Sequence, residues 1–402
     1  CDIRPRIDVT ATVPAGRLGG LYGLYFAVVA LGVGWFGPFF QSLGFAAEQI
    51  GIAVGVLTGS KIVAPYFWGY LGDLVPNRLR VIQVGMLGAT VASGFLVADF
   101  DFIGLCLILA AYGLFWNAII AQFDTLTLEY LGGAHHRYSQ IRVWGSIGFI
   151  AMMLASGWWF SVFPYAWLPW IMLLGLIASG LLSLTLPPLN TSAASLQPPE
   201  SLRLRLRTPV VWIFFAVAAT NQLTHGPLNV FFTLYLQEHG YSAFAAGQLW
   251  ALGVLAEVVL FFALPRVLAG LDLRLLLVLS LVLASFRWIG TAWFVDSVLV
   301  LLALQLLHGF TFGAIHAVSI EFVRRWFPGK LSGRGMAMYS GLVFGLGGSI
   351  GAFASGYLWS RLGGEQTFLL VGIVTAMAAA CAWVFLKDAK LEATNPRMRA
   401  FG

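Results

Sequence analysis

Apolar runs of about 20 residues recur through almost the whole chain, and they limit its fold more than any other feature. A run of this length spans the ~30 Å hydrocarbon core of a bilayer as one α-helix. The 402 residues are 59% hydrophobic and 10% charged, whereas soluble domains are about 45–50% apolar and about 25% charged. We therefore expect an all-α membrane protein. Its twelve predicted transmembrane helices are 20–43, 49–72, 80–98, 102–128, 141–163, 167–186, 210–237, 243–264, 273–295, 298–326, 334–359 and 366–386.

Basic residues fall unevenly on the two sides of these predicted spans. If the N-terminus is cytoplasmic, all but three of the 23 Lys and Arg residues lie in cytoplasmic segments, and the outer loops contain only Arg361. Short cytoplasmic loops of membrane proteins carry this excess of positive charge. The pattern predicts cytoplasmic N- and C-termini. It also explains the net charge of +6 without nucleic-acid binding, which we exclude.

One gap between the predicted spans is long. Residues 188–208 are rich in Pro, Ser and Ala, a composition typical of flexible linkers. This cytoplasmic linker separates a six-helix half at 17–187 from a six-helix half at 209–388, between tails at 1–16 and 389–402. Two six-helix halves joined by a cytoplasmic linker are the outline of the major facilitator fold, in which substrate sits between the halves near mid-membrane.

A loop motif after the second span supports this outline. Residues 69–73 (GYLGD) precede residues 76–80 (PNRLR). The pattern is similar to the major facilitator loop signature, in which a Gly and an Asp precede basic residues. Here Asp73 with Arg78 and Arg80 would latch one conformation. The alternative is that the basic residues only anchor the cytoplasmic side.

Few charged residues lie inside the predicted spans, and each is costly there unless it has a partner or a task. Glu257, Arg287 and His308 fall at similar depth on three consecutive spans. They predict either a structural Glu257–Arg287 ion pair or a proton-linked switch. His316 follows His308 by eight residues, about two helical turns, so it shares the same face. Glu321, with Glu129, lies near a helix end and is expected at the membrane interface.

The first half contributes its own buried charges. Lys61 lies in mid-span, where a cation facing a central cavity suits an anionic substrate; the alternative is a pairing with Asp124 or another acid of the first half. Asp124 and Arg142 lie on helices joined by one loop and could themselves pair. We predict a substrate-binding set made of Lys61, Asn117, Asp124, Arg142 and Trp144. The abundant aromatic residues, 15% of the chain, could add an aromatic wall.

Four segments resemble one transporter family. Residues 138–149 (YSQIRVWGSIGF), 247–261, 286–288 (FRW) and 305–312 (QLLHGFTF) are similar to the bacterial phenylpropionic acid transporters. These are proton-linked major facilitators, distantly similar to lactose permease. The resemblance covers all twelve predicted spans.

The resemblance implies roles for several residues. Asp124 and Arg142 correspond to the sugar-holding pair of lactose permease, and Glu257, Arg287 and His308 to its buried acid, arginine and histidine. Two positions depart from that pattern, because Gln305 replaces a lysine and Thr311 replaces the proton-carrying carboxylate. Lys61 matches a basic position of the phenylpropionate branch, which favours a carboxylate substrate over a neutral sugar.

The sequence thus predicts a proton-coupled symporter of the bacterial inner membrane that moves a small organic acid, an aromatic one among the candidates, by alternating access. Glu257, Arg287, His308 and His316 would couple protonation to the conformational switch. The alternatives are uptake of a neutral sugar or nucleoside, drug efflux, or a membrane sensor or interaction protein.

The sequence lacks the motifs of several other classes of protein. No metal-ligand cluster, nucleophile motif or phosphate-binding loop is present in the loops, so we expect no enzyme, no cofactor and no metal. The three Cys form no disulfide framework. The expected partners are a small-molecule substrate, protons and the lipid bilayer, and we expect a monomer.

Overall fold

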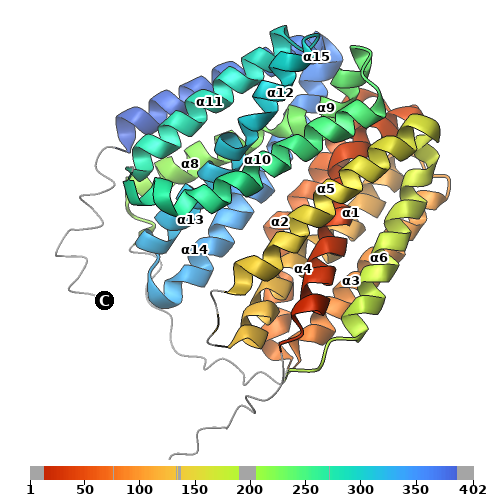
Figure 1. Cartoon of the computed structure of the whole chain (residues 1–402), viewed down its shortest axis with the longest axis vertical. Helices are drawn as coiled ribbons and strands as arrows, with labels where there is room; N and C mark the ends of the chain where they lie inside the picture. The colour runs from red at the N-terminus through yellow and green to blue at the C-terminus, as the bar shows by residue number, and fades with distance from the viewer. Residues whose placement is uncertain are drawn as a thin grey trace, which may run out of the picture.

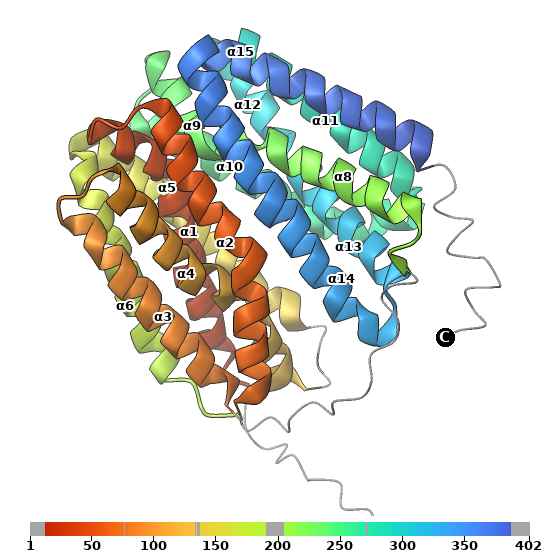
Figure 2. The ribbon, with the colours of Figure 1, turned by 180° about the vertical axis from the view of Figure 1, so that it is seen from behind.

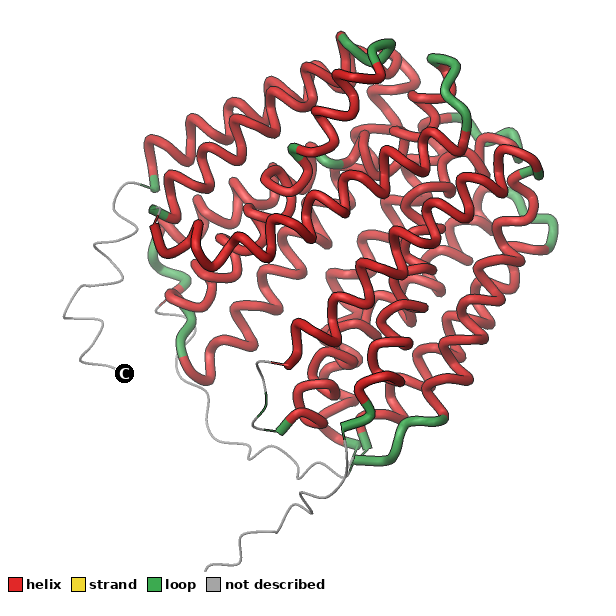
Figure 3. The backbone as a smooth tube through the Cα atoms, in the orientation of Figure 1, coloured by secondary structure: helices red, strands yellow, loops and turns green. Residues whose placement is uncertain are grey.

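A computed structural model of the chain describes residues 13–75, 77–132, 134, 137–189, 205–270 and 272–386. Within these ranges the chain is helical, with short connecting turns and no strand (Figure 3). Every apolar run predicted above lies in helix. Among the residues that the structure describes, ten helices are long and apolar enough to cross a membrane.

The first group of helices is formed by regular, nearly unbroken segments. We call it the first helix group: α1 Ala15–Ser42, α2 Ala47–Leu74, α3 Arg78–Gly94, α4 Phe102–Leu131, α5 Tyr138–Val162 and α6 Leu168–Leu184. Side-chain caps begin two of these helices, since Asn77 accepts from the Leu79 N–H and Asp101 from the Gly104 N–H. Such caps satisfy backbone donors that a helix start leaves open.

The second group is interrupted more often. We call it the second helix group: α8 Pro209–Thr224, α9 Gly226–Glu238, α10 Ala243–Gly270, α11 Leu273–Trp293, α12 Val298–Leu306, η4 Gly309–Ala314, α13 Ile315–Trp326, α14 Ser332–Tyr339, η6 Ser340–Gly347 and α15 Gly348–Phe385. Segments η4 and η6 are π-helical. Pro227, which has no N–H to donate, follows the break between α8 and α9. Gly363, at φ 79°, divides α15 into two helical segments.

The two groups lie side by side and meet along α1–α9, α2–α15, α2–η6 and α5–α10, among other contacts (Figures 1 and 2). Small residues allow the backbones to touch. A Cβ on Gly37 would lie 2.3 Å from the carbonyl oxygen of Val230, and one on Gly51 would lie 2.6 Å from the Cα of Gly356. Membrane helices commonly use such residues for close approach.

Hydrogen bonds reinforce the same boundary. Thr233 Oγ1 donates to the Gly34 carbonyl over 2.8 Å, and Ser349 Oγ donates to the Gly55 carbonyl over 2.7 Å. Both lie toward the end of the molecule where α1 ends at Ser42 and α2 begins. We call this the joined end. The helices diverge toward the opposite end, where α1 begins (Figures 1 and 2).

Candidate functional site

A buried arginine on α11 is held by three neutral side chains. Arg287 is 1% exposed. Its Nη2 donates to Gln305 Oε1 over 2.9 Å, and its Nη1 lies 3.0 Å from His308 Nδ1 and 3.2 Å from Thr311 Oγ1. The π-helical segment η4 follows His308 and places Thr311 on the same face. The guanidinium is therefore solvated by dipoles of the protein.

These bonds define the protonation pattern of the histidine. A guanidinium can only donate hydrogen bonds, so Nδ1 of His308 accepts and a neutral ring carries its proton on Nε2. Nε2 in turn lies 3.9 Å from Glu257 Oε2. The predicted direct Glu257–Arg287 ion pair is therefore wrong, because His308 lies between the two residues. α10 packs closely on η4 at Glu257, since a Cβ on Gly313 would be 3.0 Å from Glu257 Cγ. This packing positions the Glu257 carboxylate beside His308.

A column of rings continues from His308 along one face of η4 and α13. The rings of His308 and Phe312 stack with centroids 5.4 Å apart, and those of Phe312 and His316 with centroids 6.3 Å apart. His316 Nδ1 then lies 3.0 Å from the hydroxyl oxygen of Tyr339. The two histidines thus face the same way, as their eight-residue spacing predicts.

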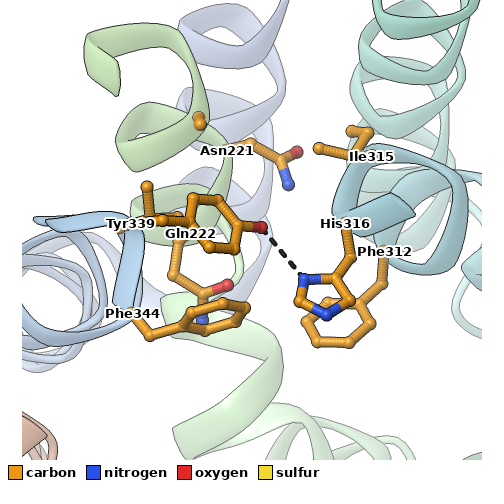
Figure 4. A pocket seen from close by; sticks show the side chains of 9 residues that line it. Asn221, Gln222, Phe312, Ile315, His316, Tyr339 and Phe344 are labelled. Atoms are coloured by element: carbon orange, nitrogen blue, oxygen red, sulfur yellow. Dashed lines mark hydrogen bonds between the residues drawn. The ribbon is translucent and has the colours of Figure 1, made fainter. Parts of the chain in front are cut away.

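Phe312 and His316 of this column form one wall of a small pocket, about 10 Å³ in volume, between α8, η4, α13, α14 and η6. Figure 4 shows His316, Tyr339 and Phe344 around it, with the amides of Asn221 and Gln222 on the α8 side. The full lining is Ala218, Asn221, Gln222, Phe312, Ile315, His316, Tyr339, Val343 and Phe344. Asn221 is 4% exposed, and its Oδ1 has no hydrogen-bond partner among the described residues. The pocket therefore combines an aromatic wall with unused amide hydrogen-bonding capacity.

In the first helix group, Asp124 is bound by tyrosines. Its carboxylate accepts from the Tyr22 hydroxyl over 2.6 Å and from the Tyr138 hydroxyl over 2.8 Å. The Arg142 guanidinium lies over the Phe26 ring, 4.1 Å from its centroid, and forms no ion pair with Asp124 within 4 Å. The predicted Asp124–Arg142 ion pair is wrong, because the two hydroxyls occupy the carboxylate and the cation lies on an aromatic face.

Arg142 also faces the second helix group. It lies close enough to Glu257 and His316 to act on both electrostatically. Cation and carboxylate thus attract each other across the boundary between the two groups, on the side of the molecule away from the joined end. This arrangement makes their interaction depend on how the groups are placed relative to each other.

Lys61 points away from the apolar outer surface of α2. Val63, Phe67 and Tyr70 on that surface are 59%, 50% and 65% exposed. Successive helical residues are rotated by about 100°, which puts Lys61 on the opposite side, between the contacts of α2 with α4 and with η6. The Lys61 ammonium forms no ion pair or hydrogen bond with any described residue. Lys61 and Asp124 are therefore not paired in this structure.

Asn117 holds the helix that carries this lysine. Its Nδ2 donates to the Leu57 carbonyl over 3.0 Å and to Ser60 Oγ over 2.8 Å. Both acceptors lie on α2 within one turn of Lys61. The Nδ2 of this amide is thus engaged in a contact between α4 and α2, and the substrate-binding role of Asn117 stays a prediction.

The remaining predicted residues lie near the divergent end. Trp144 is 52% exposed, and its ring lies 2.8 Å from where a Cβ on Gly19 would be. Arg78 contacts Gln122 Oε1 over 2.5 Å and Glu129 Oε1 over 3.3 Å.

Within the proposed latch, Arg80 is exposed, and the side chain of Asp73 lies outside the described residues. The latch therefore stays a prediction. Glu321 pairs with Arg324 and Arg325 near the end of α13, consistent with an interfacial position.

The sequence reasoning missed the tyrosines around Asp124. Tyr138 lies four residues before Arg142, so the i, i+4 spacing could have shown that the two share a face. Tyr22 lies in an apolar run, where no local signal separates it from lipid-facing aromatics. In the described part of the chain, no three His, Cys, Asp or Glu residues are placed to hold a metal ion.

Two groups of long apolar helices with buried charged residues at their boundary define a membrane transporter. The chain belongs to the MFS_1 like family, whose sequence model matches residues 16–370. It is thus a multi-pass transporter of the major facilitator superfamily and not an enzyme.

Known relatives and solved structures agree with this assignment. The chain is 27% identical over 371 residues to the probable 3-phenylpropionic acid transporter of Escherichia coli (strain K12), covering 89% of this chain and 94% of that protein. It is 26% identical over 286 residues to the maltose permease of Geobacillus stearothermophilus, covering 69% and 70%. The crystal structure of the nucleoside transporter NupG superposes with a TM-score of 0.82 at 16% identity, covering 93% of this chain and 99% of that chain.

Proposed function

We propose that the protein is a proton-coupled symporter that moves a small aromatic carboxylate by alternating access. The observation that carries the proposal is Lys61, a cation that faces the space between the helix groups without a partner among the described residues. A charge in that position is costly. An anionic substrate would offset the cost, and its carboxylate would bind the ammonium.

The aromatic pocket supports the second part of the proposal. Thr58, one turn before Lys61, and Gln222 of the pocket both lie against Gly348, where a Cβ would be 2.9 Å from Thr58 Cγ2 and 3.7 Å from Gln222 Cγ. Cation and pocket are therefore neighbours at one depth. A substrate with a carboxylate at one end and a ring at the other would place the ring against Phe312 and Phe344 once this pocket, about 10 Å³ in the present conformation, has widened.

The chain of contacts from Glu257 through His308 to Arg287 would couple the proton to transport. Glu257 would carry the proton, since Thr311 offers no carboxylate. Ionised, it is attracted to Arg142 across the boundary; protonated, it loses that attraction. Protonation would thereby change the relative energies of the two conformations, as alternating access requires.

The same proposal includes the membrane topology. The paired helices α8 and α9, each too short to be counted as a span alone, would cross once together, and α15 with the segments before it would cross twice. The chain would then form two six-helix halves, 17–187 and 209–388, joined by the linker 188–208. Its termini would lie in the cytoplasm of a bacterium and its joined end outside the inner membrane.

Transport in proteoliposomes tests the proposal. Uptake of radiolabelled 3-phenylpropionate should rise when the lumen is made alkaline relative to the outside, and a protonophore should abolish this rise. Lys61→Gln should lose binding at least tenfold, because it removes the ammonium while keeping a long polar side chain. Arg361→Gln, in a predicted outer loop and away from the site, is the matched control. Uptake at the same rate with and without the pH gradient would refute proton coupling.

A neutral nucleoside is the second candidate substrate. The unpartnered Oδ1 of Asn221 and the amide of Gln222, beside aromatic rings, would suit a base, which offers hydrogen-bonding edges and a flat ring. Labelled uridine separates the two: a nucleoside carrier should bind it and be little affected by Lys61→Gln.

A further inference from the structure

A groove on the outer surface of the second helix group lies far from the site between the groups. It runs between α11 and the second segment of α15, which lie side by side (Figures 1 and 2), and its volume is about 510 Å³. Its walls are Val278, Val282, Ser285, Phe286, Ile289, Ala376, Ala379, Ala380 and Trp383. From Val278 to Ile289 the groove extends about 16 Å at 1.5 Å per residue, about half the hydrocarbon thickness of a bilayer.

The walls of the groove are almost entirely apolar, and Ser285 and the indole of Trp383 are their polar side chains. The hydroxyl of Ser285 donates to the Gly372 carbonyl over 2.8 Å. On the α15 side the groove is lined by small alanine side chains. On the α11 side the larger side chains of Val282 and Phe286, 50% and 64% exposed, project outward beside it. Such a long, apolar and narrow hollow fits a hydrocarbon chain.

One end of the groove carries a cation. The Arg274 guanidinium lies over the Trp383 ring, 4.5 Å from its centroid, and donates to the Trp383 carbonyl. Its Nε is buried and has no hydrogen-bond partner among the described residues. A guanidinium has five N–H donors; apart from the buried Nε and the donor on the Trp383 carbonyl, the remaining Nη N–H groups can bind an anion. Arginine binds phosphate oxygens through two parallel N–H groups.

We propose that this groove binds an anionic phospholipid, with one acyl chain between α11 and α15 and the headgroup phosphate on Arg274. The charge decides the class of lipid, since a basic residue beside a groove between membrane helices favours anionic headgroups. The inference rests on the embedding of the protein in a bilayer and is independent of the transported substrate.

Native mass spectrometry of the detergent-purified protein tests this site. The first bound dioleoylphosphatidylglycerol should have a Kd about fivefold lower than the first bound dioleoylphosphatidylcholine. Arg274→Gln should remove this preference. Arg361→Gln should keep it, although Arg361 also lies over an aromatic ring, 4.8 Å from the Tyr357 centroid. Equal affinities for the two lipids in the unmodified protein would overturn the proposal, and so would equal losses in the two arginine variants.

A second variant tests the groove itself. Ala376→Leu combined with Ala380→Leu fills it from two exposed positions, so the helix contacts are kept. This variant should weaken the first binding event for both lipids at least fivefold, with an unchanged melting temperature after delipidation. Unchanged lipid binding in this variant would show that the acyl chain lies elsewhere and would overturn the proposal even if Arg274→Gln failed to fold.

Discussion

The contact between α1 and α9 provides a direct way to change the conformational equilibrium. In Gly37→Ala the new Cβ would be placed 2.3 Å from the Val230 carbonyl oxygen, whereas ordinary van der Waals contact begins at 3.4 Å. The joined end must therefore open by about 1 Å. Overpacking of this kind costs about 1–3 kcal/mol. Only the conformation closed at the joined end contains this contact and bears its free-energy cost. The equilibrium ratio of the closed and the open conformation should therefore change about 5- to 150-fold.

Spin labels at Gln41 and Glu238 measure this shift. Both residues are exposed and lie at the ends of the two helices that meet at Gly37. Double electron–electron resonance should show a short distance in the parent protein. In Gly37→Ala a second, longer distance should become the main population.

The control is Gly180→Ala, since a Cβ at Gly180 has no neighbour within 4 Å. It makes the same gain in helix propensity, up to about 1 kcal/mol, without a clash. Identical distance distributions in the two variants would refute the reasoning. A lower melting temperature with an unchanged distribution would also refute it, because the contact would then be equally present in both conformations.

Three further predictions follow from the site. Gln305→Leu removes an acceptor from the buried Arg287 and should destabilise the protein by about 1.5–3 kcal/mol, measured by thermal unfolding in detergent, whereas Gln305→Glu should keep the melting temperature. Tyr138→Phe removes one donor to the Asp124 carboxylate and should lower stability by about 1–2 kcal/mol; an unchanged melting temperature would contradict that contact. Asn117→Ala should raise KM for the transported substrate severalfold while kcat changes less than twofold, as expected if it positions the lysine-bearing helix.

The helical fold could be predicted from hydropathy because the bilayer requires long apolar helices. Every predicted run is helical, although the ends differ by several residues. The break at His225 was not predicted, since Gly226 and Pro227 lie within an apolar run that reads as continuous. The two π-helical segments were also missed, because these spans are apolar almost throughout, so the one-residue change of helical phase that a π-turn introduces cannot be recognised in the sequence.

The candidate site was predicted less completely. The similar predicted membrane depth of Glu257, His308 and Arg287 indicated that they lie near one another, and the structure places them in contact in that order. Membrane depth could not show which of these side chains touch, because the contacts depend on helix rotation and on glycines such as Gly313. The neutral partners of Arg287 show the limit most clearly: Gln305 and Thr311 were noted only as departures from a resemblance.

The two π-helical segments have a consequence for how the pocket can change shape. They touch through Phe312 and Phe344, whose ring centroids are 6.3 Å apart, and both residues line the pocket. A π-turn holds about one residue more than an α-turn. Rewinding either segment to α would rotate the residues beyond it by about 100°. The aromatic wall can therefore be rebuilt by a local change of winding, while the ends of the helices stay where the membrane holds them.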